Sequence, residues 1–117
     1  MSNVIYIVDN HTYVANLPIN RPEDYERLTE RQKKILSMWI REILEPHRIQ
    51  TFNDFSLNSY ALKHEFQFSG CGFYVTNGQF KGAMLREGFY PKDEAHLNWI
   101  FKLPKKLNKK TDFKLKL

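Results

Sequence analysis

The chain has 117 residues, of which 42% are hydrophobic, 15% aromatic and 26% charged, a composition typical of one globular domain. No stretch approaches the roughly 18 apolar residues of a membrane-spanning helix, and the first residues lack the pattern of a secretory signal peptide. The single cysteine, Cys71, excludes an intramolecular disulfide framework and a cysteine-based zinc site. We therefore expect one domain over residues 1–117, located in the cytoplasm and away from membranes.

Positive charge is concentrated at the C-terminal end of the chain. The net charge is +5, and residues 102–117 hold seven lysines and one acidic residue, Asp112. That segment therefore carries +6, and residues 1–101 sum to −1. A basic segment joined to a nearly neutral body is typical of proteins that meet nucleic acid or another anionic surface. It also occurs as a solubilising terminus, and the sequence leaves both interpretations open.

Residues 1–20 predict a β-hairpin. The β-branched and aromatic residues at 4–8 (VIYIV) and 12–17 (TYVANL) favour strands, and the intervening DNH is typical of a turn. Pro18 and Pro22 then mark a short connector to the next element.

The strongest helical pattern follows Thr29. Thr29 and Gln32 have the spacing of a capping box, in which the two side chains satisfy backbone N–H groups at the helix start. Apolar residues then recur at helical spacing as far as Leu44, and Pro46 ends the pattern. A preceding helical turn is expected over residues 24–27.

Two shorter helices are predicted further along. Asn58 or Ser59 can cap the first, whose apolar face is about two turns long. Thr76 and Gln79 have the spacing of a second capping box and start the other. The link between these helices, at 67–75, is longer than the three or four residues usual in a helix-turn-helix.

Two glycines carry information about the last of these helices. Gly88 is well placed as the left-handed residue that ends it. Gly82 lies within it, where glycine costs about 1 kcal/mol relative to alanine. We therefore expect another segment of the chain to approach the helix closely at Gly82.

Strand periodicity returns near the C-terminus. Trp99, Phe101 and Leu103 alternate with Ile100 and Lys102. Residues 113–117 alternate phenylalanine or leucine with lysine, and the polar span between the two stretches can form a hairpin loop. We expect a C-terminal β-hairpin in which residues 104–117 supply the basic loop and the second strand.

Together these elements predict an α+β domain with an N-terminal β-hairpin (1–20), a three-helix winged-helix-like core (22–103) and a C-terminal β-hairpin. In a winged helix-turn-helix the third helix enters the major groove of DNA and the hairpin contacts its backbone. Asparagine, glutamine and arginine can bond to base edges, and lysine can bind phosphate. The candidate nucleic-acid-binding residues are Asn77, Gln79, Lys81, Arg86, Lys105, Lys106, Lys109 and Lys110.

Three stretches carry resemblances to known families. LTERQKKIL at 28–36 resembles the start of the first helix in bacterial helix-turn-helix regulators, and NGQFKGAMLREGF at 77–89 is similar to the recognition helix of winged-helix modules in phage and plasmid primase-helicases. SYALKHEF at 59–66, followed by GFYVTNGQFKGAMLREGF at 72–89, resembles small uncharacterised proteins of phages and integrative elements. The resemblance implies a mobile-element setting, and hence the cytoplasm of a host cell, without implying an activity.

No cluster of side chains predicts catalysis. His64 and Glu65 are adjacent and would point in different directions on a helix, and the other histidines lack ligand spacing. We expect His64 to be half-buried beside Tyr60 or Phe68, and Cys71 to be a small packing residue. The sequence therefore predicts a non-enzymatic protein with no catalytic residues, no metal and no other cofactor.

Two functional hypotheses remain. The first is a nucleic-acid-binding accessory or regulatory protein of a phage or mobile element, acting on DNA or RNA; a homodimer would suit such a reader of paired half-sites. The alternative is a small phage-encoded inhibitor that binds a host enzyme or defence complex. Convergence of Lys81, Arg86 and the C-terminal lysines on one face favours the first, whereas their dispersal beside an exposed aromatic patch favours a protein partner.

Overall fold

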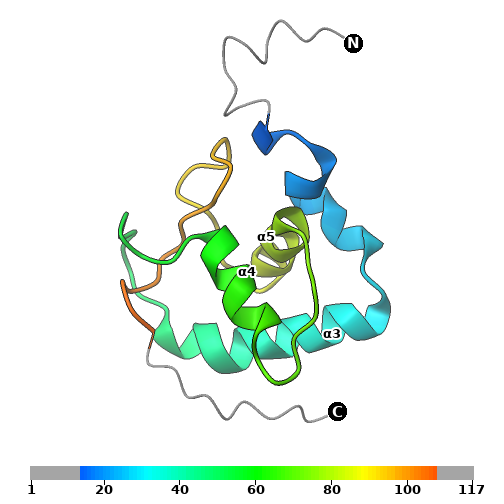
Figure 1. Cartoon of the computed structure of the whole chain (residues 1–117). Helices are drawn as coiled ribbons and strands as arrows, with labels where there is room; N and C mark the ends of the chain where they lie inside the picture. The colour runs from blue at the N-terminus through cyan, green and yellow to red at the C-terminus, as the bar shows by residue number, and fades with distance from the viewer. Residues whose placement is uncertain (1–13, 108–117) are drawn as a thin grey trace, which may run out of the picture.

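The computed structural model describes residues 14–107, and all the regular structure in this range is helical (Figure 1). No β-strand occurs within it, so the predicted α+β fold with β-hairpins is wrong. The α-helices are α3 (Glu30–Trp39), α4 (Ser59–Gln67) and α5 (Asn77–Arg86). Two 3₁₀ helices, η1 (Pro18–Asn20) and η2 (Pro22–Arg27), precede α3, and a π-helix, η3 (Ile40–Leu44), and a 3₁₀ helix, η4 (Glu45–His47), continue it.

The described part of the second predicted N-terminal strand, residues 14–17, forms helical turns instead. The backbone N–H of Leu17 and the side-chain amide of Asn20 both donate to the carbonyl of Val14, at 3.2 and 2.8 Å. Pro18 occupies the first turn of η1, where its fixed φ suits a helix. These local bonds override the weak strand propensity of the segment. The predicted strand at 4–8 lies outside the described residues.

The helix predicted after Thr29 is confirmed, together with its cap. The Thr29 hydroxyl accepts from the Gln32 backbone N–H at 3.1 Å, and the Gln32 side chain accepts from the Thr29 backbone N–H at 2.8 Å. The helical course continues through η3 and through η4, which contains Pro46, and it ends at His47, so the predicted end at Pro46 is one residue early. The helical turn expected at 24–27 is confirmed as part of η2.

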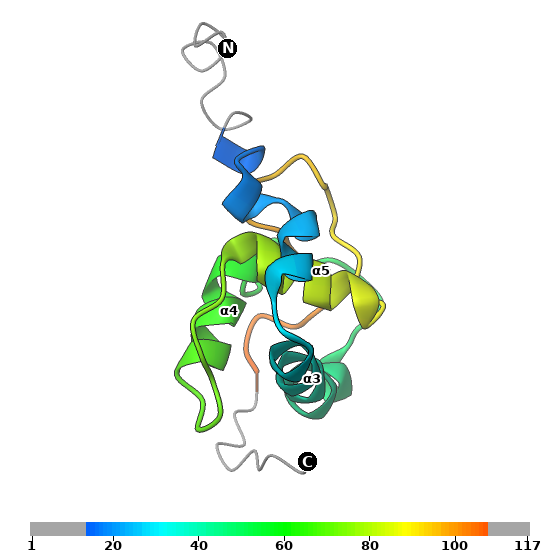
Figure 2. The same cartoon turned by 90° about the vertical axis from the view of Figure 1, so that its right-hand side faces the viewer.

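Helix α5 occupies the centre of the fold, in contact with η1, η2, α3 and α4 (Figures 1 and 2). A Cβ on Gly82 would lie 2.4 Å from the Pro22 carbonyl oxygen and 2.4 Å from the Tyr25 Cβ. Such separations are far inside van der Waals contact, so the predicted close approach at Gly82 is confirmed. Gly88 follows the helix with φ +82°, as predicted for its left-handed end.

The predicted strand at 99–103 is extended but has no β-ladder. Trp99, Phe101 and Leu103 are buried and Lys102 is exposed, so the predicted alternation of faces is confirmed. The backbone bonds, however, go singly to different segments: Ile49 N–H donates to the Lys102 carbonyl at 3.0 Å, and a separate bond joins Trp99 to the start of α4. Side-chain burial, not strand pairing, holds this segment. The second predicted strand, 113–117, lies outside the described residues.

The hydrophobic core joins the helices to this extended segment. Trp39 lies edge-on to Phe66 and Phe80, with ring centroids 5.5 and 6.3 Å apart. Edge-to-face packing of this kind adds about 0.5–1.5 kcal/mol per pair beyond area burial. Within residues 14–107 no helix is long and apolar enough to cross a membrane.

Candidate functional site

Lys81, the centre of the predicted groove-reading helix, points into the protein. It is 1% exposed, its Nζ donates to the Asn20 carbonyl at 2.9 Å, and that Nζ lies 4.9 Å from the centroid of the Trp99 ring. Burial lowers the pKa of Lys81 to about 8. In this position the Lys81 ammonium links α5 to η1 through a hydrogen bond, and it is too deeply buried to contact a phosphate at the surface.

Asn77 is also internal, at the junction of three segments. Its side-chain oxygen accepts from the Ser59 hydroxyl at 2.8 Å, and its amide donates to the Leu97 carbonyl and the Asn98 side chain, each at 3.0 Å. Gln79 closes the capping box by accepting from the Thr76 backbone N–H at 2.9 Å. Both amides therefore have structural partners in place of base edges.

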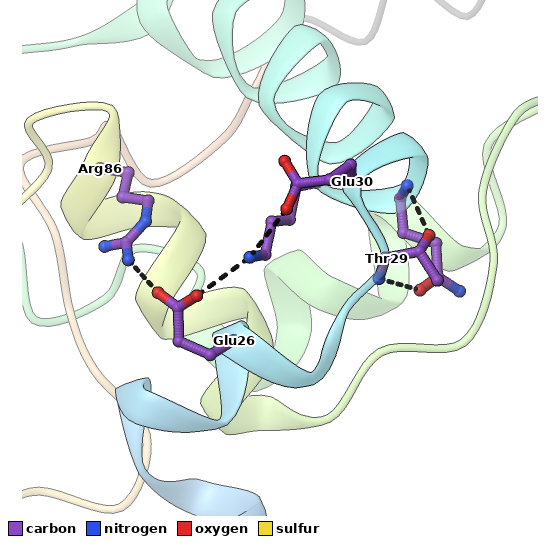
Figure 3. Close-up of polar contacts among 6 residues, drawn as sticks. Glu26, Thr29, Glu30 and Arg86 are labelled. Carbon is purple, nitrogen blue, oxygen red and sulfur yellow. Dashed lines mark hydrogen bonds and ion pairs between the residues drawn. The ribbon is translucent and has the colours of Figure 1, made fainter.

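Arg86 lies at the exposed end of α5 and pairs with an acidic residue of the preceding segment. Figure 3 shows its guanidinium directed at Glu26, which also accepts from Lys33 Nζ at 3.0 Å. The hydrogen bond from Lys33 lowers the pKa of Glu26, with both cations adding attraction. The Arg86 guanidinium also lies 4.3 Å from the Tyr25 ring centroid. Its charge is thus engaged within the protein.

The C-terminal lysines form a separate group. Lys105 and Lys106 are exposed, and neither forms an ion pair within residues 14–107. Lys109 and Lys110 lie outside the described residues. Because Lys81 is buried and Arg86 is paired with Glu26, the described candidate cations do not form one basic surface along α5.

Exposed aromatic side chains gather instead on α4 and on the loop that follows it. Tyr60, His64 and Phe68 are spaced by four residues, with ring centroids 4.5 Å apart in the first pair and 6.2 Å apart in the second. Tyr74, from the loop, joins them through Lys63. The rings are far from buried: Tyr60 is 51% exposed, Phe68 84% and Tyr74 70%. We call Tyr60, His64, Phe68 and Tyr74 the aromatic face.

A pocket of about 390 Å³ opens beside the aromatic face, between α4, η1 and the start of α5. This volume falls in the range of small-ligand and side-chain pockets. Tyr60, His64 and Tyr74 contribute rings to its lining, and Asn20, Asn77 and Asn98 contribute amides. Among the described residues, its lining contains no acidic side chain, and Lys63 is the only lysine or arginine that lines it.

Lys63 is a buried lysine that lines this pocket. It is only 5% exposed, and its Nζ lies 5.2 Å from the Tyr60 ring centroid and 5.0 Å from that of Tyr74. The Nζ donates to the Gln67 side chain at 3.0 Å, and Lys63 forms no ion pair within residues 14–107. Burial lowers its pKa. The sequence signal for Lys63 is slight: it lies one helical turn before Phe66, an apolar residue of the predicted short helix, and both side chains are buried in α4.

The expectation for His64 is confirmed, since its half-buried ring lies between Tyr60 and Phe68. Cys71 is a free thiol, partly buried and packed against the core. In the part of the chain that the structure describes, no group of three or more His, Cys, Asp or Glu side chains is arranged to hold a metal ion.

A second pocket, of about 400 Å³, is lined in part by charged residues that pair with one another. Lys92 binds Asp54 at 2.7 Å, and His96 lies 3.3 Å from Asp93. The aromatic face is therefore the stronger candidate site.

No protein-family model, curated protein or solved structure matches this chain.

Proposed function

We propose that this protein is a non-enzymatic protein-binding module that docks through the aromatic face. The observation that carries the proposal is the contiguous cluster of exposed rings on α4 and its following loop, beside a pocket. Tyrosine and phenylalanine are enriched in the centres of protein interfaces, where they supply large contact area at low cost in side-chain entropy. Exposed apolar patches of this kind are uncommon on monomeric surfaces without a partner.

The charge distribution supports a protein partner over a nucleic acid at this face. Surfaces that stack nucleic-acid bases combine aromatic rings with several exposed cations that follow the backbone. Within the part of the chain that the structure describes, Lys63 is the only lysine or arginine that lines the pocket, and it is buried. With the mobile-element resemblance stated above, the proposed partner is a host protein in the cytoplasm, whose activity this chain would inhibit or redirect.

The test compares capture of host proteins by three forms of the full chain. The wild type, a face variant (Phe68→Ser with Tyr74→Ser) and a control variant (Phe55→Ser with Tyr90→Ser) are immobilised. The control pair is matched, because Phe55 is 80% and Tyr90 66% exposed but neither belongs to the aromatic face. We expect a protein that the wild type and the control capture and that the face variant loses. Equal capture by all three forms, or none by any, contradicts the proposal.

A second candidate function is sequence-independent nucleic-acid binding by the C-terminal lysines. The observation that favours it is the exposure of Lys105 and Lys106, which begin the most basic part of the sequence. Binding of duplex or single-stranded DNA should then weaken steeply between about 50 and 200 mM salt. Lys105→Gln with Lys106→Gln should flatten that slope, whereas Lys81→Met should not. An unchanged slope in the double variant would exclude this function.

A further inference from the structure

We infer that the pocket beside Lys63 binds a carboxylate from an acidic side chain of the partner protein, placed between Tyr60 and Tyr74. This inference rests on the proposed function, because it names the chemistry that the aromatic face would recognise. It is carried by Lys63, a buried cation that forms no ion pair within residues 14–107, at the wall of an open pocket whose described lining residues include no acidic side chain.

The Lys63 ammonium is only partly hydrogen-bonded. It has three N–H donors, and the hydrogen bond to Gln67 at 3.0 Å uses one of them. The rings of Tyr60 and Tyr74, about 5 Å from Nζ, attract the charge but accept no conventional hydrogen bond. The ammonium therefore keeps hydrogen-bonding capacity toward the pocket that Lys63 lines.

Leaving the buried Lys63 ammonium without a carboxylate partner has a free-energy cost. Burying an ammonium without a carboxylate disfavours its charged form, and the lowered pKa of Lys63 has that cause. A carboxylate entering the pocket would accept from Nζ and compensate the charge at low local dielectric, where such pairs are strongest.

The pocket has room for an acidic side chain. The pocket volume of about 390 Å³ accommodates a side chain of the size of aspartate or glutamate together with ordered water. Asn98 also lines the pocket, and its side-chain oxygen accepts from Asn77, so its amide N–H groups are the atoms that could donate to a carboxylate. The hydroxyl of Thr76, another lining residue, donates to Asp24 at 2.6 Å instead. The rings around it supply apolar contact for the methylene groups and backbone of the partner segment.

The test uses two acetylated, amidated peptides, Glu-Phe-Glu and Gln-Phe-Gln, titrated into the isotope-labelled full chain and followed by backbone amide NMR shifts. We expect Glu-Phe-Glu to shift the signals of Tyr60, Lys63 and Tyr74, and to bind at least about tenfold more tightly than Gln-Phe-Gln. Lys63→Met should abolish that difference, Lys63→Arg should keep most of it, and Lys102→Met, at an exposed lysine, should leave it intact.

Equal affinity for the two peptides in the wild type overturns the carboxylate inference even if Lys63→Met fails to fold. Absence of shifts at these residues with either peptide overturns it as well. Tighter Lys63-dependent binding of inorganic phosphate, or of an oligothymidylate, than of Glu-Phe-Glu would also overturn it and assign the pocket to a phosphate. The capture experiment with the face variant is independent of all three results, so failure of the carboxylate inference and failure of the proposed function are distinguishable.

Discussion

Helices α4 and α5 are built from similar sequence features yet have opposite relations to the surface. Each begins with a side-chain cap, from Asn58 in α4 and from Thr76 in α5, and each carries a buried lysine one turn into the helix. Helix α5 is in contact with η1, η2, α3 and α4, so most of its first two turns are buried. In helix α4, Leu62 and Phe66 are buried, whereas Tyr60 is exposed to solvent.

Residue type alone therefore does not show which helix faces a partner. Helix α5 has the amides and cations of a groove-reading helix, but Asn77, Gln79 and Lys81 form hydrogen bonds within the fold. Helix α4 looks like an ordinary short amphipathic helix, and it presents the aromatic face. What decides the outcome is coverage by segments far away in the sequence, above all η2, which lies against α5 (Figure 2).

The largest predicted effect contrasts the two sides of α4. Phe66 is completely buried and packs on Trp39, so Phe66→Ala should lower the free energy of unfolding by about 3–5 kcal/mol. Phe68 is 84% exposed, so Phe68→Ala should change it by less than about 0.5 kcal/mol. Urea unfolding of both variants measures the contrast. Similar losses from the two variants would mean that the aromatic face is part of the core.

A smaller effect tests the coverage of α5 by η2. Gly82→Ala places a methyl group against the Pro22 carbonyl and Tyr25, and should destabilise the fold by about 1–3 kcal/mol despite the better helix propensity of alanine. Gly70→Ala is the matched control, because a Cβ at Gly70 meets nothing within 4 Å. The control should be neutral or slightly stabilising. A neutral Gly82→Ala would show that η2 does not press on α5.

The capped helices and the buried faces could be predicted from the sequence because they depend on local patterns. Thr29 and Thr76 sit at fixed spacing from glutamine, and the alternation of Trp99, Phe101 and Leu103 marks their shared side whether or not a ladder forms. A periodicity of two shows which side chains are buried, but it does not show that a neighbouring strand exists. That is why the C-terminal hairpin was predicted and is absent from the described part of that segment.

The candidate site was harder to predict, because burial of a polar residue depends on distant segments. Nothing near Lys81 in the sequence indicates that the Asn20 carbonyl and the Trp99 ring enclose its ammonium. Lys63 likewise acquires its surroundings from Tyr74, on the loop after α4. The spacing of Tyr60, His64 and Phe68 was visible in the sequence, but that spacing is equally typical of a buried helix face.

The third prediction concerns the charge of Lys81 inside α5. With a pKa of about 8 in the folded state and 10.5 as its ordinary value, the unfolded chain holds the proton more tightly between these pH values. Stability contributed by this group therefore rises as the pH increases from about 8 to about 10. The stability of the wild type relative to Lys81→Met should increase by on the order of 1 kcal/mol between about pH 7.5 and 9.5. Urea unfolding at the two pH values measures it, and parallel pH profiles would place the ammonium in water.

The smallest effect is expected at the other cation of the same helix, Arg86. The Arg86 side chain is 51% exposed, and its guanidinium pairs with Glu26. Glu26 keeps Lys33 as a partner if the arginine is lost. Exposed ion pairs contribute little because water already solvates both charges, and salt screens what remains. Arg86→Gln should therefore shift the urea midpoint only slightly at low salt, and less at high salt. A loss as large as that of Gly82→Ala, or one that salt leaves unchanged, would show that the end of α5 is held as firmly as its buried start.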